Sequence, residues 1–133
     1  MVGAKMNKRY ILQDEIGRGG MGVVYRAWDR LTDSQVALKR VVVNSSHLSF
    51  ASRHDPNAET SLQLSLAQEF STLATLRHPN IVSVLDYGFD EAKRPFFTMT
   101  LLEEAQPIVA VAQSLTDTEK IELLQQLLQA MRY

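Results

Sequence analysis

A glycine-rich hexapeptide between two strand-like segments is the feature that most constrains the fold. Residues 17–22 read Gly-Arg-Gly-Gly-Met-Gly, a G-x-G-x-x-G pattern. In a dinucleotide-binding unit this pattern lies between a strand and a helix whose N-terminus holds the pyrophosphate. Here the segment Val-Val-Tyr-Arg-Ala-Trp follows, and such residues favour a strand. The glycines are therefore expected in a β-hairpin, which either folds its backbone N–H groups over phosphates or holds no ligand.

The rest of the chain predicts an α+β fold. Periodic apolar residues at Leu62, Leu66, Phe70 and Leu73 indicate a helix over 58–76. The segment Thr-Asp-Thr-Glu at 116–119 matches a capping box and predicts a second helix over 117–131. We expect a five-stranded antiparallel sheet, whose strands are separated by turn residues and lie at 10–16, 22–28, 35–43, 81–88 and 95–102.

Composition excludes several classes of function. The 14 Lys and Arg residues balance 15 Asp and Glu, so no basic field attracts nucleic acid or anionic lipid. The sequence has no cysteine, and His47, His54 and His78 lack metal-ligand spacing. Its apolar runs are too short to span a bilayer, and its N-terminus does not match a secretory signal. We therefore expect a cytoplasmic protein with no metal site, no nucleic-acid partner and no membrane segment.

Two charged residues outside the glycine loop are candidates for an ion pair. Lys39 lies within an expected strand and shares a face with Ala37 and Val41. A strand lysine is usually solvated, but an inward one needs a partner because a buried ammonium is costly. Glu69 lies beside Phe70 at the border of the apolar face of the expected helix. The pattern favours a pair between Lys39 and Glu69.

The chain resembles the N-terminal lobe of a serine/threonine protein kinase, including the bacterial members. The motifs that carry the resemblance occur in the family's order. They are the glycine loop extended to G-x-G-x-x-G-x-V, the strand Val-Ala-Leu-Lys39, the helical Gln-Glu69-Phe, and His78-Pro-Asn-Ile-Val. The resemblance implies three segments: an N-terminal extension (1–9), an ATP-binding lobe with hinge and an insertion at about 44–57 (10–102), and the start of an incomplete helical C-terminal lobe (103–133).

The resemblance also implies an ATP site. Lys39 would bind the α- and β-phosphates and pair with Glu69, and these two are the implied catalytic residues. The motif glycines would cover the phosphates, the aliphatic side chains would pack on adenine, and Met99 would be the gatekeeper before the hinge. The implied nucleotide-binding set is Ile16, Gly17, Arg18, Gly19, Gly20, Met21, Gly22, Val24, Ala37, Lys39, Met99, Thr100, Leu101 and Leu102.

The sequence departs from the family pattern in ways that bear on activity. The spacing from Lys39 to Glu69 is longer than is typical, and no glycine follows the hinge at 103–108, so ribose contacts are not assigned. The motifs H-R-D-x-x-x-x-N and D-F-G, which hold the catalytic base and the magnesium ligands, are absent from residues 1–133.

The resemblance thus implies a parent enzyme that transfers the γ-phosphoryl group of ATP to Ser or Thr hydroxyls of a protein substrate, with Mg²⁺ expected only in the full-length kinase. Residues 1–133 alone are expected to be inactive. Two alternatives remain open. One is a non-catalytic module, like a pseudokinase or a short natural protein, that binds a nucleotide or a partner. The other is a plain strand-and-helix domain with coincidental motifs.

Overall fold

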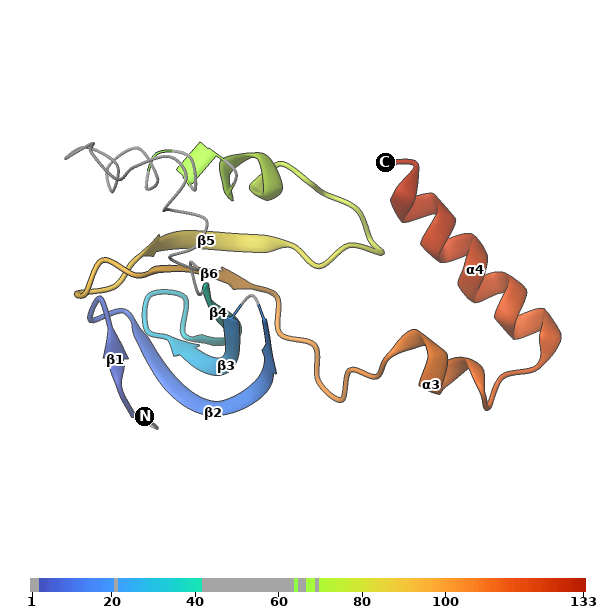
Figure 1. Cartoon of the computed structure of the whole chain (residues 1–133), viewed down its shortest axis with the longest axis horizontal. Coiled ribbons are helices and arrows are strands. Elements are labelled where there is room, and N and C mark those ends of the chain that lie inside the picture. Colours follow the sequence, from blue (N-terminus) through green and yellow to red (C-terminus); the bar gives the residue numbers. More distant parts are fainter. Residues whose placement is uncertain (1–2, 21, 42–63, 65–66, 69) are drawn as a thin grey trace.

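The computed structural model describes residues 3–20, 22–41, 64, 67–68 and 70–133 (Figure 1). Its centre is a six-stranded antiparallel sheet in the order β1-β2-β3-β4-β6-β5. The five expected strands are all present, and a further two-residue strand precedes them. The described elements are β1 (Lys5–Met6), β2 (Tyr10–Gly19), β3 (Gly22–Asp29), β4 (Ser34–Val41), β5 (Val84–Phe89), β6 (Pro95–Met99), α3 (Ile108–Ala112) and α4 (Asp117–Met131).

Strand β1 makes the N-terminal residues part of the sheet. Met6 pairs with Tyr10 across a tight turn and is 3% exposed. The turn residues Asn7 and Lys8 have φ values of 52° and 59°, a left-handed conformation that reverses the chain within a few residues. A two-residue strand is too short to show any periodicity, so sequence patterns predict only an extension here. The buried Met6 side chain contributes to the core instead.

Strand alternation gives the sheet two faces with different roles. The inner face carries the hydrophobic core, and the sheet curls around it (Figure 1). The opposite, outer face follows from the cross-strand register, in which Lys39 pairs with both Val24 and Phe97. Paired residues point to the same side, so these three side chains share the outer face. The core cluster comprises Met6, Tyr10, Leu12, Val23, Tyr25, Ala27, Val36, Leu38 and Phe96.

A partly buried ionic cluster joins the two ends of the curled sheet. The Arg9 guanidinium donates to both carboxylate oxygens of Asp29, each at 2.8 Å, and to Oδ2 of Asp86 at 2.6 Å. The Tyr10 hydroxyl donates to the same Asp86 oxygen at 3.2 Å. Because Arg9 precedes β2 and Asp86 lies on the edge strand β5, one side chain links strands far apart in the sheet order.

Hydrogen bonds and burial change the acidity of two members of the cluster in opposite directions. Asp29 is 3% exposed, and its bonds to Arg9, the Leu31 N–H and the Thr32 hydroxyl hold the pKa of the Asp29 carboxyl well below its usual range. Burial raises the pKa of Tyr10 to about 12. The cluster is therefore an ionised carboxylate clamped by a cation beside a neutral phenol.

The outer face is covered in part by a helical segment at 70–74. The Phe70 side chain is 4% exposed, and its ring lies 5.2 Å from that of Phe97 and 5.6 Å from that of Tyr87, between centroids. This aromatic contact places the helix against β5 and β6. About half of the segment 58–76, over which this helix was expected, lies outside the described residues.

Helix α4 begins and ends where the sequence predicts. The Thr116 hydroxyl accepts from the Glu119 N–H, and the Glu119 carboxylate accepts from the Thr116 N–H, which completes the capping box. The short helix α3 precedes it and was not predicted. Among the described residues, no helix combines the length and the apolar character needed to cross a bilayer. Five large apolar side chains of α4 are exposed: Ile121, Leu124, Leu127, Leu128 and Met131.

We expect Asp29→Asn to lower the free energy of unfolding by about 2–3 kcal/mol near neutral pH, since it removes charge-assisted bonds from a buried site. Because folding lowers the pKa of Asp29, its stabilisation is present above the ordinary aspartate pKa of 3.8 and is lost as the pH falls below that value. Urea unfolding from pH 7 to pH 3 measures both effects. The exposed turn carboxylate of Asp33 supplies the matched control, Asp33→Asn. Equal pH dependence in the two variants would contradict the assignment.

Candidate functional site

The outer face of the sheet brings together four of the expected site residues. Val24 on β3 lies directly across from Lys39 on β4, and Ala37 on the same strand pairs with Met99 of β6. The Lys39 ammonium lies 6.0 Å from the centroid of the Phe97 ring, within the range of a cation–π contact. The prediction that Lys39 and Ala37 share a face is thus confirmed.

The partner expected for Lys39 is Glu69, which lies outside the described residues. Met21 of the glycine loop also lies outside them. The pair between Lys39 and Glu69 stays a prediction. The neighbouring Phe70 packs on Phe97, so the helical segment that follows Glu69 does reach the face that carries Lys39.

The glycine loop forms the tip of the hairpin between β2 and β3, as the sequence predicts. Gly17 pairs with Val24 and Gly19 pairs with Gly22 across the hairpin. A strand rather than a helix follows the last glycine, so the dinucleotide-binding arrangement is excluded. Ile16, at the start of the hairpin, is 42% exposed, and Arg18 and Gly20 are also exposed.

Gly22 is the loop position where the backbone requires glycine. Its φ is +143°, and a Cβ atom there would overlap the carbonyl oxygen of Arg40. The hairpin therefore rests directly on the backbone of β4, one residue after Lys39. Gly19 and Gly20 have open space around the position of a Cβ atom. Gly22, the third motif glycine, thus places the start of β3 against β4, whereas Gly19 and Gly20 are uncrowded.

The segment expected to be the hinge leaves β6 at Met99 and exposes backbone groups. The Thr100 N–H donates to the carbonyl of Ser83 at 3.0 Å, so that donor is already used. Among the described residues, no backbone hydrogen bond involves Leu101 or Leu102. The N–H and C=O groups of these two residues are therefore available to form hydrogen bonds with a ligand.

Sequence reasoning missed an ion cluster at the open edge of this face. Arg26 pairs with Ala37 in the sheet register; its Nε donates to Asp14 at 3.0 Å and its Nη1 to Glu103 at 2.7 Å. The bond to Glu103 raises the pKa of Arg26. No local pattern reveals this contact, because Arg26 and Glu103 are 77 positions apart in the sequence.

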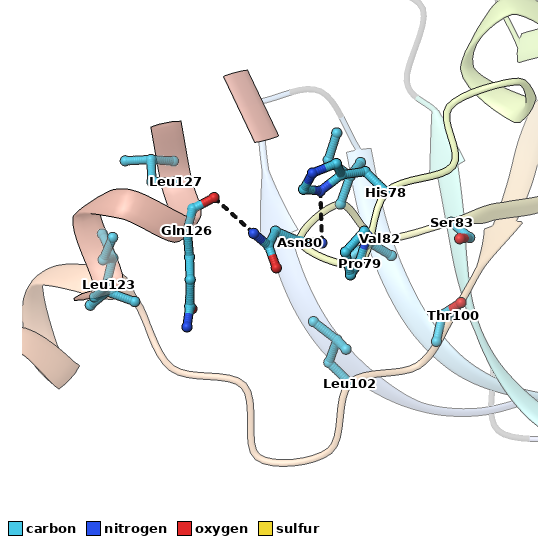
Figure 2. A pocket seen from close by; sticks show the side chains of 12 residues that line it. His78, Pro79, Asn80, Val82, Ser83, Thr100, Leu102, Leu123, Gln126 and Leu127 are labelled. Carbon is cyan, nitrogen blue, oxygen red and sulfur yellow. Dashed lines mark hydrogen bonds between the residues drawn. The ribbon is translucent and has the colours of Figure 1, made fainter. Parts of the chain in front are cut away.

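A cavity of about 610 Å³ lies on the other side of the hinge segment (Figure 2). In it the Asn80 side chain donates to the carbonyl of Gln126 on α4 at 2.9 Å, and the Asn80 N–H donates to Nδ1 of His78 at 3.0 Å. Thr100 and Leu102 line the cavity, but none of the outer-face residues does. The His-Pro-Asn turn therefore joins the sheet to α4, and this cavity is separate from the face that carries Lys39.

We expect Gly22→Ala to lower the free energy of unfolding by about 2 kcal/mol or more, because the added methyl group meets the Arg40 carbonyl at a strained φ. Gly20→Ala is the matched control and should change stability by about 0.5 kcal/mol or less, since its position is open. Thermal and urea unfolding of both variants measure the difference. Equal stabilities would show that Gly22 is not in close contact with the Arg40 carbonyl of β4.

Comparisons of the chain with family models and with curated proteins agree on one family. A family model described as the protein kinase domain matches residues 10–133. The DNA damage-responsive serine/threonine-protein kinase RqkA of Deinococcus radiodurans is 43% identical over 103 residues, which cover 75% of this chain and 13% of that protein. Mitogen-activated protein kinase 8 of Oryza sativa is 29% identical over 130 residues, covering 94% of this chain and 21% of the relative.

The solved structures extend the likeness to the fold. The kinase domain of Mycobacterium tuberculosis PknI superposes with a TM-score of 0.70 at 19% identity, over 98% of this chain and 48% of that one. The chain thus spans about half of that solved domain and less than a quarter of the two curated relatives. With the kinase model matching from Tyr10 to the last residue, the chain belongs to the protein kinase family and to its serine/threonine type.

Proposed function

We propose that the outer face of the sheet binds ATP beneath the glycine hairpin. One observation carries the proposal: three features lie close together on the sheet. They are the glycine hairpin in contact with β4 at Gly22, the Lys39 ammonium, and the hinge backbone at 101–102. Phosphate binding needs N–H donors and a cation, and adenine binding needs an apolar slot beside exposed backbone groups. All of these are available on one face.

Each part of the site has a chemical task in this proposal. The hairpin N–H groups face the phosphates without side chains between them, and Lys39 neutralises the α- and β-phosphate charge. Glu69 holds the ammonium in place by pairing with it. The adenine ring lies against Val24 and Ala37, with Ile16 at the mouth of the slot.

The hinge side of the proposed site orients the adenine ring. Met99 stands at the end of β6 beside Ala37 and limits the depth of the adenine slot. The adenine edge bonds to backbone groups of Leu101 and Leu102, since the Thr100 N–H is already bonded to the Ser83 carbonyl. In this arrangement the hinge backbone recognises adenine, and the hairpin and Lys39 bind the phosphates.

We extend the proposal to the whole protein as a kinase that transfers the γ-phosphoryl group of ATP to Ser or Thr hydroxyls of a protein substrate. Mg²⁺ would supply charge neutralisation at the phosphates in that reaction. Among the described residues, no group of three or more His, Asp or Glu side chains is arranged to hold a metal ion. The residues on this chain therefore bind and orient the nucleotide, and no step through the metal is assigned to them.

A non-catalytic role is the second candidate for residues 1–133 taken by themselves. Residues 1–133 contain neither H-R-D-x-x-x-x-N nor D-F-G, so the known base and metal ligands of the family are not among them. A nucleotide-binding or partner-binding module needs only the hairpin, the lysine and the hinge. Binding without transfer is the behaviour expected of these residues in either case.

We expect the chain to bind a fluorescent ATP analogue and Lys39→Met to weaken that binding by about tenfold or more, because a charge-assisted bond to the phosphates is lost. Lys120→Met on α4 is the matched control, since Lys120 is an exposed lysine on an element away from the outer face. Fluorescence titration gives both dissociation constants. Equal weakening in both variants, or no binding by the unaltered folded chain, would contradict the proposed site.

We expect residues 1–133 to transfer no phosphate above background when incubated with radiolabelled ATP, Mg²⁺ and a peptide rich in Ser and Thr. The reason is that positioning of the hydroxyl and of the metal requires the missing motifs. The control is the same assay with Lys39→Met, which defines the background. Transfer by the unaltered chain that Lys39→Met abolishes would overturn this expectation.

A further inference from the structure

Three charged side chains from separate segments meet at the open edge of the proposed nucleotide site. They are Asp14 of β2, Arg26 of β3 and Glu103, which directly follows the expected hinge; we call them the edge clasp. The Arg26 guanidinium bonds Asp14 through Nε at 3.0 Å and Glu103 through Nη1 at 2.7 Å. Both distances are those of charge-assisted hydrogen bonds. A single cation therefore ties the hairpin strands to the segment beyond the hinge.

The position of Arg26 relates the clasp to the site. Arg26 lies directly across from Ala37, a residue of the proposed adenine slot, and projects from the same outer face. Asp14 lies where the β2–β3 register is irregular, between Leu12 and Glu15. Such irregularities redirect side chains, which explains why Asp14 reaches Arg26 rather than a regular cross-strand neighbour. The clasp thus spans the rim of the slot between the hairpin and the hinge.

We propose that the edge clasp restrains the opening of the glycine hairpin away from the hinge and thereby slows the release of bound nucleotide. The inference rests on the proposed ATP site. Raising the hairpin moves β3 away from the segment after the hinge, so it must break the bond between Arg26 and Glu103. The bond to Asp14 stays intact in that movement, because Asp14 and Arg26 belong to the same hairpin.

The exposure of the clasp suits a restraint that opens and closes. The side chains of Asp14 and Glu103 are both 60% exposed, and that of Arg26 is 25% exposed. Ion pairs with this exposure are weak individually and are screened by salt. The clasp therefore alters the rate of opening by a few-fold and does not lock the site.

The other ion pair of the hairpin cannot perform this task. Arg18 bonds Glu15 at 2.8 Å, but both residues belong to β2 and move together. The Arg9 cluster joins strand ends through Asp29 and Asp86, and neither is a neighbour of the hinge in sequence or register. Of the described ion pairs, the one between Arg26 and Glu103 crosses from the hairpin to the post-hinge segment.

The test measures the dissociation rate of a fluorescent ATP analogue by stopped-flow displacement with unlabelled ATP. The variants of the full chain are Arg26→Gln, Glu103→Gln and the two combined, which form a double-mutant cycle. Glu104→Gln is the matched control, because it removes an adjacent exposed carboxylate that makes no ion pair among the described residues. Each variant's melting temperature is recorded so that a loss of fold is recognised.

We expect Arg26→Gln and Glu103→Gln each to speed dissociation about two- to five-fold, the range for exposed pairs, with no further gain in the double variant. Higher salt should speed dissociation from the unaltered chain by a larger factor than dissociation from Arg26→Gln, because salt screens the contact of Lys39 with the phosphates in both and the clasp only in the former. Glu104→Gln should behave as the unaltered chain.

Two results would overturn the inference, and they differ in what else they overturn. Unchanged dissociation in Arg26→Gln, or gains that simply multiply in the double variant, would remove the clasp as a restraint and leave the ATP site standing. If the folded, unaltered chain binds no analogue, the proposed function itself fails and the clasp fails with it. Amide hydrogen exchange at residues 100–104 without nucleotide gives an independent reading: faster exchange in Arg26→Gln supports the restraint, and unchanged exchange opposes it.

Discussion

The bridge that Arg9 makes between Asp29 and Asp86 is the interaction on which the rest of the architecture depends. The sheet is open in its pairing order, with β1 and β5 as its two edges. Arg9 joins the second strand to the edge strand, and the Asn7 side chain bonds the Phe89 carbonyl nearby at 2.7 Å. These contacts hold the sheet in its curled form. The curl in turn separates a closed apolar interior from an accessible exterior.

That separation determines where chemistry is possible on this molecule. Side chains of the inner face pack in the core and do not reach a ligand, since Leu12, Ala27 and Leu38 are 1% exposed or less. Polar function must therefore use the outer face, where Lys39, Val24 and Phe97 are only partly buried. The aromatic contact of Phe70 with Phe97 covers one part of this face; among the described residues, Val24 next to the hairpin keeps part of its surface exposed. The packing of the core thus limits the site to one region of the sheet.

Much of this arrangement could be predicted because it depends on local signals. The glycine hairpin, the strand that carries Lys39 and the capping box of α4 each have a short sequence signature, and the described structure confirms all three. The family resemblance, drawn from motifs in order, is confirmed by the kinase model. The assignment of individual site residues to ATP stays a proposal, since no ligand contact tests it.

The features that sequence reasoning missed depend on contacts over long separations or on elements too short for a pattern. Strand β1 has two residues and is defined by the left-handed turn that follows it. The bond from Arg26 to Glu103 and the bond from Asn80 to Gln126 join residues 77 and 46 positions apart. Charged and polar residues at these positions would read equally well as solvated surface, so only the folded chain identifies their partners.

The contact of Gly22 with the Arg40 carbonyl has a mechanical consequence. It leaves no room between the hairpin and β4 at that point, whereas a Cβ atom at Gly19 or Gly20 would meet no neighbouring atom. The hairpin is therefore in contact with β4 as far as the pair of Gly19 with Gly22, and the open space lies at the turn. Because this contact lies one residue after Lys39, a movement of the whole hairpin carries β4 and the ammonium with it.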